Sequence, residues 1–583
     1  MRQKIEKLGE LVLRILVAAL MLGLVSFSGA WSVDKASSPT APQVQSPKPA
    51  PAKAAPAPTV KPAPAKAAPA PTAKPVIMSS EGAQLEAGKT FRIIKIQVGG
   101  NNLVSDKEIG SLVKNYEGKD LTLEDLKKLS LEIQQLYKNK SYFLARVYVP
   151  AQEIQNGIAR LQVLEGKLGE VKVEGNRYYS TKFIKKYFAP VAKDGAVSYE
   201  ELQRSLLLLN EFTDLSVKSV LAAGSDPGST DITLKVADKK PFHVGLDYNN
   251  FGNPYTGENR AGLNLNWGNL FGQGDMMAVR SVFAFPSKTQ TPFYQAAYIV
   301  PLCSKGTKLT VSYASADMKV GQELEILDIR GEAAIYGLAV GIPLQRTIAV
   351  SSDLNVGFTS KSSKNYIFRQ NTSDDEIRLL NVGYNRNWVG GRGRNILAFN
   401  ISQGLGTLFG GMQDNDVRAS RRNAGDSFTK FGLDLARIQQ VGSKNFLILR
   451  GSAQVCGTPL AVGELFSLGG VDSVRGYAQS EFLGDNGYFV SAEFRVPITS
   501  FRSNPLQGAL FVDQGSVSIN NPGPGEKGNQ SLFGGGIGLR YSIGNDTAFR
   551  VDWGFPFSPP PICSGGIPFS TVSSRPGCNK ENS

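Results

Sequence analysis

The sequence predicts a signal peptide and a Pro/Ala-rich linker, two α+β domains, and then an antiparallel transmembrane β-barrel of about 16 strands. One observation is a strand–helix–helix–strand–strand order that occurs twice between residues 91 and 236. Another is a long series of segments after residue 242 that alternate apolar with polar or small residues and are separated by turn residues. The 62 glycines and the single histidine among 583 residues also fit a β-rich chain better than a catalytic α/β domain.

These patterns divide the chain into six parts. We expect a signal peptide at 1–30, a Pro/Ala/Lys-rich disordered linker at 31–88, α+β domains at 89–166 and 167–240, a transmembrane β-barrel at 241–557 and an atypical closing segment at 558–583.

The N-terminus has the pattern of a secretory signal. Basic residues at 2, 4, 7 and 14 precede the apolar run Ile15–Phe27, and small residues follow at 28–30. The run is short for a membrane span, although an uncleaved anchor is the alternative interpretation. In both cases the rest of the chain is exported.

Residues 39–75 consist almost entirely of Pro, Ala, Lys, Thr and Ser, and the string Lys48–Thr59 recurs unchanged as Lys61–Thr72. This composition favours an extended polyproline II spacer with a reach on the order of 100 Å. It is a passive tether or, alternatively, a cell-wall contact through its lysines. Ten Lys and Arg against three Asp and Glu in residues 1–80 place +7 of the net charge of +14 in this N-terminal part, so we expect no nucleic-acid partner.

The two α+β domains share one order of elements. Two unrelated, generic α+β domains are the alternative, but such domains would have no reason to share that order. Their helices begin at polar caps: Ser105 with Glu108 and Ser198 with Glu201 predict capping boxes, and Thr122 and Ser180 predict simple caps. The first copy has strands at 91–98, 143–149 and 158–164 and helices after 105 and at 123–140; the second has strands at 169–175, 215–221 and 231–236 and helices at 183–188 and 202–209.

The barrel strands alternate, and aromatic residues such as Trp267, Phe285 and Trp388 lie near their ends, as an interfacial girdle requires. A soluble β-sandwich array is the alternative, but such arrays show a denser apolar face. The predicted strands are 244–248, 261–267, 277–285, 293–299, 308–313, 331–342, 348–358, 377–388, 395–401, 428–438, 446–455, 488–496, 509–513, 532–541 and 548–555.

The most specific signal is a glycine-rich loop that carries Val474, Arg475, Gly476 and Tyr477, followed about one hairpin later by the strand Phe511–Gly515 with Asp513 at its centre. We predict that the Arg475 guanidinium meets the Asp513 carboxylate as a bidentate pair. An Arg-Gly turn alone is common in ordinary surface loops. By strand count this loop joins about the eleventh and twelfth strands, on the side opposite the α+β domains.

Together these features resemble the two-partner secretion transporters of the hemolysin-activator type, within the superfamily of outer-membrane assembly and secretion proteins. The resemblance covers residues 90 to about 557 and is sharpest at Gly469-Gly470, Val474–Tyr477 and Phe511–Gly515. It implies that the α+β domains are POTRA domains and that the glycine-rich loop folds back into the barrel. Arg475, Gly476, Tyr477, Asp513 and Gly515 would then lock the loop to the barrel wall.

The resemblance also implies an outer-membrane translocase whose periplasmic POTRA domains capture an unfolded secreted exoprotein by adding its extended segment to a sheet edge. The partners would be this exoprotein, outer-membrane lipid and lipopolysaccharide, and the barrel-assembly machinery. A barrel insertase and, less favoured, a passive solute channel are the alternatives.

The chain departs from the family pattern in two places. Trp31–Ser46 has no amphipathic period and contains two prolines, so a plugging helix is not expected there. After residue 557 only Ile567–Val572 could form a closing strand, and it is shorter than the nine to eleven residues, roughly, of a spanning strand. Our hypothesis is that the C-terminus either results from an altered reading of the gene or leaves the barrel with a weakly closed seam.

Catalytic and metal-binding patterns do not occur. The four cysteines have no zinc spacing, although Cys563 and Cys578 are near enough in sequence to pair. His243 begins the first barrel strand without a nucleophile motif beside it. We therefore expect no enzyme, no cofactor and no metal site.

Overall fold

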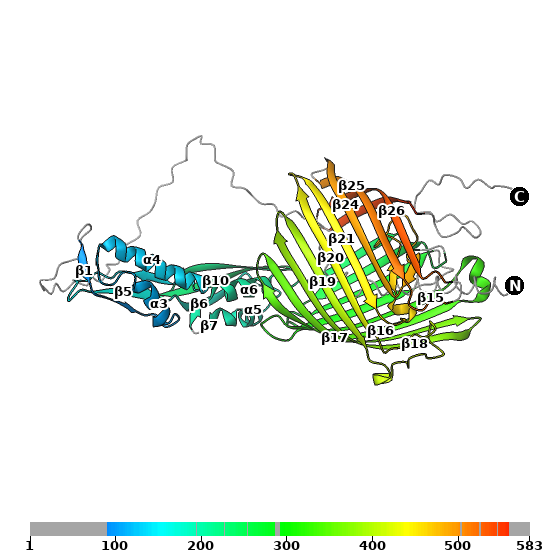
Figure 1. The fold of residues 1–583 in the computed structure, drawn as a ribbon, viewed down its shortest axis with the longest axis horizontal. Coiled ribbons are helices and arrows are strands. Elements are labelled where there is room, and N and C mark those ends of the chain that lie inside the picture. Colours follow the sequence, from blue (N-terminus) through cyan, green and yellow to red (C-terminus); the bar gives the residue numbers. More distant parts are fainter. Residues whose placement is uncertain are drawn as a thin grey trace, which may run out of the picture. The chain divides into compact units, whose positions relative to one another are not determined.

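The computed structural model describes residues 90–558, apart from 194, 227, 253–254, 286–291, 502–503, 524–525 and 545. The expected signal peptide, the linker, Cys563, Cys578 and Ile567–Val572 lie outside the described residues. The chain forms two compact units that divide between Glu165 and Gly166, and each is described by itself. Figure 1 shows the helices of the α+β modules and the large sheet that follows them.

The first unit is an α+β module built on a three-stranded sheet in the order β2–β5–β4. Strands β2 and β5 are parallel, whereas β4 and β5 are antiparallel, and a separate ribbon pairs β1 with β3. The elements are β1 (Phe91–Ile93), β2 (Lys95–Gly99), α3 (Asp106–Val113), β3 (Lys119–Leu121), α4 (Leu123–Asn139), β4 (Arg146–Tyr148) and β5 (Ile158–Leu164).

Helix α4 supplies one side of the core of this module. Leu126, Leu129 and Ile133 recur at helical spacing and are at most 1% exposed. At its start Thr122 and Asp125 exchange hydrogen bonds with each other's backbone as a capping box, where the sequence predicted only a simple cap.

Two predicted caps and one predicted strand are corrected. Ser105 and Ser198 occupy N-cap positions, but neither side chain caps its helix; the Ser105 hydroxyl donates to the Glu108 carboxylate instead. The predicted strand at 91–98 is split between β1 and β2 at Ile94, whose side chain is 66% exposed.

The second module repeats the arrangement of the first. Its sheet runs β7–β8–β6–β10–β9, with β6 parallel to β10 and β9 antiparallel to it. Ser180 caps α5 through the Phe183 amide, as predicted. The elements are β6 (Lys167–Glu174), α5 (Thr181–Phe188), η1 (Ala189–Val191), β7 (Ala192–Lys193), β8 (Ala196–Val197), α6 (Tyr199–Leu209), β9 (Leu215–Ala223) and β10 (Ser229–Asp238).

The third part is one antiparallel sheet of fifteen strands that curves into a barrel (Figure 1). All fifteen predicted strand positions are confirmed, and the observed strands are longer. They are β11 (Phe242–Asn249), β12 (Asn259–Gly268), β13 (Met276–Phe285), β14 (Phe293–Pro301), β15 (Lys308–Lys319), β16 (Arg330–Arg346), β17 (Val350–Ile367), β18 (Gln370–Gly390), β19 (Gly393–Gly404), β20 (Thr429–Val441), β21 (Asn445–Cys456), β24 (Asn486–Phe501), β25 (Asn504–Ser518), β26 (Asn529–Ile543) and β27 (Thr547–Pro556).

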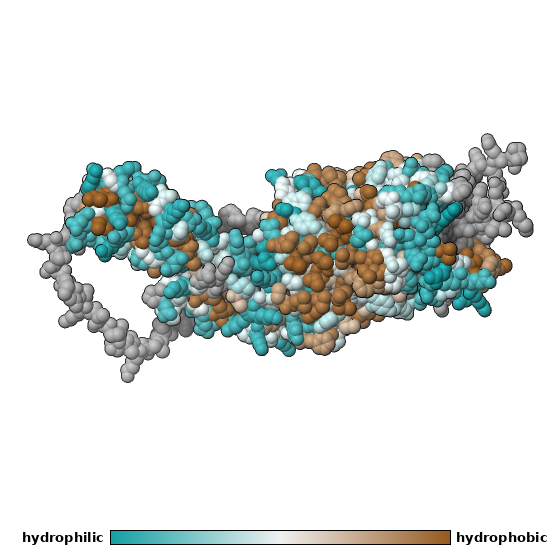
Figure 2. Space-filling model, turned by 60° about the horizontal axis from the view of Figure 1, so that its bottom comes forward, coloured by the Kyte–Doolittle hydropathy of each residue, from teal (hydrophilic) through white to brown (hydrophobic). Residues whose placement is uncertain are grey.

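The outer surface of the barrel is apolar because every second side chain points outward. In β11, Val244, Leu246 and Tyr248 are 58%, 83% and 71% exposed, while Asp247 between them accepts a hydrogen bond from Asn264 of β12. Figure 2 shows the resulting hydrophobic band, with hydrophilic surface on both sides of it. Within residues 90–558, no helix has the length and hydropathy needed to cross a membrane.

Within the described strands, β11 pairs only with β12 and β27 only with β26. The count is therefore fifteen rather than the about 16 expected from the sequence. The second α+β module contacts the turns that join β12 to β13 and β14 to β15, and the adjoining end of β16. For example, Arg204 of α6 donates to the Lys305 and Pro343 carbonyls. This end of the barrel is called the near end and the opposite one the far end.

Candidate functional site

The candidate site is the loop between β21 and β24, residues 457–485, which we call the inward loop. It contains η4 (Val462–Glu464) and two short strands, β22 (Phe466–Leu468) and β23 (Phe482–Gly484), which pair as the arms of a hairpin. The loop starts at the far end of the barrel, as the strand count predicted.

Arg475 at the tip of the inward loop is 3% exposed and contacts two neighbouring barrel strands. Its Nε and Nη2 donate to the two oxygens of Asp513 in β25, at 2.7 and 2.9 Å. Its Nη1 donates to Glu493 of β24 at 2.6 Å, and Nη2 also reaches the Ser491 hydroxyl at 3.3 Å. The guanidinium carbon lies 3.5 Å from the centre of the Phe511 ring. Each of the three nitrogens of the guanidinium therefore donates to a side chain of the barrel wall.

The depth of this contact follows from the strand geometry. Asp513 lies five residues before Ser518, the far end of β25. At about 3.4 Å per residue the Arg475 contact is about 17 Å below that end. The loop therefore folds into the barrel rather than away from it.

Charged residues of four strands extend the Arg475 contact into a network. Glu493 is 4% exposed and pairs with Arg495 at 2.7 Å and Arg540 at 3.2 Å, in addition to Arg475. Asp552 of β27 pairs with Arg540 and Arg550, both at 2.7 Å. The sequence analysis did not identify Glu493, Arg540 or Asp552 as site residues.

Glycines in the wall make room for the loop. A Cβ on Gly554 of β27 would lie 2.5 Å from the Gly476 nitrogen, and a Cβ on Gly534 of β26 would lie 2.4 Å from the Arg475 carbonyl oxygen. Gly476 itself has φ +97°, a conformation that glycine adopts readily. The backbone of the tip therefore rests directly on the backbone of the last two strands.

Tyr477 and Gly515 complete the predicted set. The Tyr477 hydroxyl donates to the Phe533 carbonyl at 2.8 Å and accepts from the Ser558 amide at 3.0 Å. A Cβ on Gly515 would lie 2.4 Å from Cδ1 of Leu468 in the inward loop. The structure thus places all five predicted residues at the contact between the loop and the wall.

The first limb of the inward loop is held on another part of the wall. Glu464 of η4 is 2% exposed and pairs with Lys361 of β17 at 2.5 Å and Lys430 of β20 at 2.6 Å. Burial alone would raise the pKa of Glu464, but the two ammonium groups lower it to about 2. Because β17 is the seventh strand and β25 the thirteenth, the loop spans between distant parts of the wall and crosses the barrel interior.

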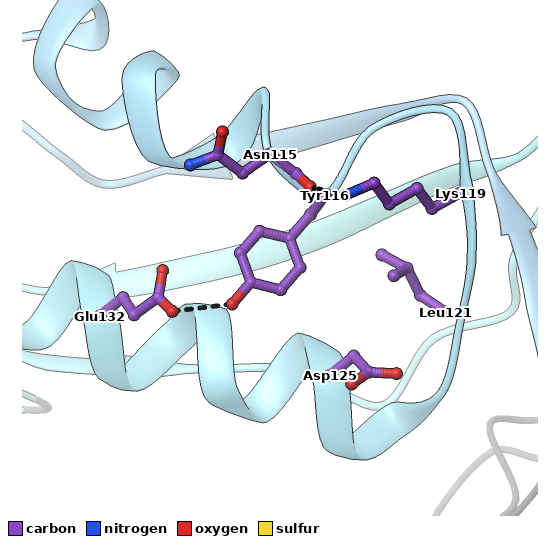
Figure 3. Close-up of a pocket in the computed structure, with 6 residues that line it drawn as sticks. All are labelled: Asn115, Tyr116, Lys119, Leu121, Asp125 and Glu132. Carbon is purple, nitrogen blue, oxygen red and sulfur yellow. Dashed lines mark hydrogen bonds between the residues drawn. The ribbon is translucent and has the colours of Figure 1, made fainter.

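The first α+β module has a pocket of its own. It has a volume of about 420 Å³ and lies between the β3 region and α4 (Figure 3). The Tyr116 hydroxyl donates to Glu132 at 2.8 Å, Lys119 donates to the Asn115 carbonyl, and Asp125 belongs to the Thr122 capping box. Tyr116, Lys119 and Asp125 thus have partners within the module, so we assign no ligand to this pocket.

These features define the class of protein: an outer-membrane β-barrel transporter with a loop folded into its barrel and the second α+β module at its near end. Residues 228–541 match the family model described as haemolysin secretion/activation protein ShlB/FhaC/HecB, and residues 91–166 match the ShlB-type POTRA domain. The chain belongs to this haemolysin secretion/activation family.

Individual relatives agree with this assignment. The heme/hemopexin transporter protein HuxB of Haemophilus influenzae is 25% identical over 489 residues, which cover 80% of this chain and 84% of HuxB. The hemolysin transporter protein ShlB of Serratia marcescens is 22% identical and covers 78% of this chain and 81% of ShlB. The solved structure of CdiB from Escherichia coli superposes with a TM-score of 0.71 at 20% identity, covering 83% of this chain and 89% of CdiB.

The predicted family, the POTRA domain followed by a large antiparallel barrel sheet, and the outer-membrane location are confirmed. The chain is an outer-membrane translocase that exports a secreted exoprotein through its β-barrel, and its POTRA domain lies in the periplasm. The near end of the barrel is therefore periplasmic and the far end extracellular.

Proposed function

We propose that the inward loop is the gate of this translocase and that Arg475, Gly476, Tyr477, Asp513 and Gly515 hold it in a docked, secretion-competent position, from which the exoprotein displaces it during export. The observation that supports this role is the buried Arg475 guanidinium, with two bonds to Asp513 and one to Glu493. Removing one partner of a buried ion pair costs about 3–5 kcal/mol, because the other charge is left unpaired. The loop therefore has a strongly preferred docked position.

In this proposal the periplasmic modules capture the unfolded exoprotein along a sheet edge, and its folding outside the cell drives export. The barrel contacts outer-membrane lipid and lipopolysaccharide through its apolar band and is itself inserted by the barrel-assembly machinery. We infer no nucleic-acid partner, because +7 of the net charge of +14 lies in residues 1–80. We infer no cofactor and no catalytic activity, because the sequence shows no zinc-ligand spacing and no nucleophile paired with a base.

The test is export of the exoprotein partner by cells that carry wild type, Arg475→Ala, Arg475→Lys or the control Arg422→Ala, an exposed arginine at the far end. We expect Arg475→Ala to leave a folded barrel in the outer membrane but to abolish export. Arg475→Lys should restore export only in part, since lysine cannot make the bidentate contact. Unchanged export with failed assembly of other barrels would instead support the insertase alternative.

A charge swap between Arg475 and Asp513 is a weaker test than the sequence alone would suggest. Arg475→Asp would place a carboxylate beside Glu493, which lies 2.6 Å from the native guanidinium. Because this like-charge contact is unfavourable, we expect the double variant Arg475→Asp with Asp513→Arg to recover little export.

A further inference from the structure

A second far-end loop packs against the inward loop. It joins β19 to β20, contains η3 (Leu408–Gly410) and spans residues 405–428, and we call it the clasp loop. It was not singled out by any sequence motif. Its contacts divide into one set with the barrel wall and one set with the inward loop.

The wall contacts lie along the far end of β18. Strand β19 pairs with β18 only from Leu379 onward, so the residues of β18 before Leu379 are not paired with β19. The clasp loop takes this place: the Met412 amide donates to the Glu376 carbonyl at 2.7 Å, and the Asp374 amide donates to the Arg418 carbonyl at 2.8 Å. The clasp loop is therefore fixed to the wall by backbone hydrogen bonds.

The contacts with the inward loop centre on Arg421. Its Nη1 donates to Asp485 at 2.7 Å and to the Leu460 carbonyl at 2.8 Å, and its Nη2 donates to the other Asp485 oxygen at 3.2 Å. Beside it the Val462 amide donates to the Ser420 hydroxyl at 3.0 Å. One arginine thus bridges both limbs of the inward loop, since Leu460 lies in the first and Asp485 at the end of the second.

The ion pair of this bridge is largely buried, with the Arg421 side chain 12% exposed and that of Asp485 fully covered. Asp485 is fully buried and accepts from the Leu460 amide at 2.6 Å and the Asn520 amide at 2.7 Å as well as from Arg421. A buried carboxylate is costly without a cationic partner. An apolar cluster surrounds the bridge; it contains Met412, Ala424 and Phe428 of the clasp loop and Leu460, Ala461, Val462 and Leu465 of the inward loop.

We propose that the clasp loop is a second part of the export gate and that Arg421 positions the inward loop through Asp485. The inference rests on the proposed gating role of the inward loop. The two loops pack through a shared apolar cluster and a shared buried ion pair, so neither leaves its docked position without disrupting that packing. Release of the inward loop therefore requires the clasp loop to separate from it.

The first experiment measures the conductance of the purified full-length protein in planar lipid bilayers. We expect Arg421→Ala to increase the fraction of time in the open state at least tenfold, Arg421→Lys to have a smaller effect, and the adjacent exposed Arg422→Ala to match wild type. Equal conductance of Arg421→Ala and wild type would overturn the proposal.

The second experiment tests whether separation is required. Ser420→Cys with Val462→Cys, in a background with Cys303, Cys563 and Cys578 replaced by Ser and Cys456 by Ala, would link the two loops by a disulfide detectable on a non-reducing gel. We expect export to be lost when the link is formed and restored by a reductant. Export that continues at full rate through the linked protein would contradict the proposal.

The same assays separate this inference from the proposed gate. If Arg475→Ala changes conductance and export while the Arg421 variants and the disulfide do not, the inward loop is a gate and the clasp loop is not part of it. If Arg475→Ala also behaves as wild type, the gating role of the inward loop fails and the clasp inference fails with it.

Discussion

At the scale of single residues, Gly554 decides how closely the inward loop approaches the wall. A Cβ there would lie 2.5 Å from the Gly476 nitrogen and 2.9 Å from the Arg475 carbonyl carbon, so the tip must move. We predict that Gly554→Ala displaces the loop without changing any charge and increases the open-state conductance of the purified protein.

The matched control for that variant is Gly245→Ala in β11. A Cβ at Gly245 meets nothing closer than 3.7 Å, which is an ordinary contact. If both variants conduct alike, the close approach of the loop to β27 does not control the pore.

Glu464 gives the inward loop a defined response to acid. Its pKa is lowered to about 2 by Lys361 and Lys430 despite its burial, so its contribution to loop docking is present above its unfolded value of about 4.3 and is lost as the pH falls toward 2. We predict that Glu464→Gln, which cannot carry the charge, raises the conductance at pH 7.

The exposed Glu526 of a far-end turn provides the control for the acid response. Glu526→Gln should retain the wild-type conductance at pH 7 and the wild-type rise in acid. A Glu464→Gln protein that stays closed at pH 7 would exclude this carboxylate as an anchor of the loop.

The sequence predicted the Arg475–Asp513 contact because both residues lie in short, specific motifs. Glu493 could have been predicted from the sequence, because strand alternation places it on the same inward face of β24 as Ser491. The Arg421–Asp485 bridge could not have been predicted, because 64 residues separate its members and no local pattern marks either one. Contacts across the barrel interior depend on the curvature of the sheet, which strand periodicity does not specify.

At the scale of elements, the second α+β module is tied to the barrel by a charged contact next to α6. Glu211 pairs with Arg346 of β16 at 2.6 Å and with Lys308 of β15 at 2.9 Å. Burial alone would raise the pKa of Glu211, but the two cations lower it overall. Its stabilising contribution is therefore lost as the pH falls below about 4.3, the value of a free Glu.

We predict that Glu211→Gln weakens this contact by about 1.5–3 kcal/mol, the usual contribution of hydrogen bonds to a charged group. Faster hydrogen exchange in α6 and in the turn around Lys305 would show that the contact is weaker. The wild-type protein below pH 4 should show the same loss of protection. Glu200→Gln, exposed on the same helix, is the control. Equal exchange in all three proteins at pH 7 would mean that other contacts hold the module.

The strands were predictable in position but not in length. Strand β18 was predicted at 377–388 and runs from Gln370 to Gly390. The additional residues at its start include Asp374, Asp375 and Glu376. The alternation of apolar and polar residues therefore does not extend into this part of the strand, whereas the backbone pairing with β17 does. Sequence periodicity detects the band that faces lipid, whereas the extension beyond it depends on pairing with a neighbour.

At the scale of the whole barrel, the inward loop is anchored at three places along its length. The inward loop is held at Glu464 on the seventh and tenth strands, at Arg475 on the twelfth and thirteenth, and at Asp485 through the clasp loop. A polypeptide that leaves at the far end must therefore displace a loop with three buried charged contacts. Export and loop release are for this reason expected to be coupled.

The seam of the barrel lies between its first and last strands. Within the described residues β27 pairs on one side only, and its outward residues Phe549 and Val551 are about half exposed. Unpaired backbone groups are costly in lipid, so we expect the other side of β27 to be paired as well. The sequence offers Ile567–Val572, which lies outside the described residues.

Deletion of residues 559–583 tests this requirement. We predict that the unheated protein runs as a compact band on a detergent gel and that the deletion lowers the temperature at which this band converts to the extended form, because β27 then loses its candidate partner. Deletion of the linker at 31–88 is the control and should leave the conversion temperature unchanged. If the 559–583 deletion also leaves it unchanged, β27 and β11 close the barrel without the C-terminal segment; if the full chain shows no compact band at all, the barrel is not closed.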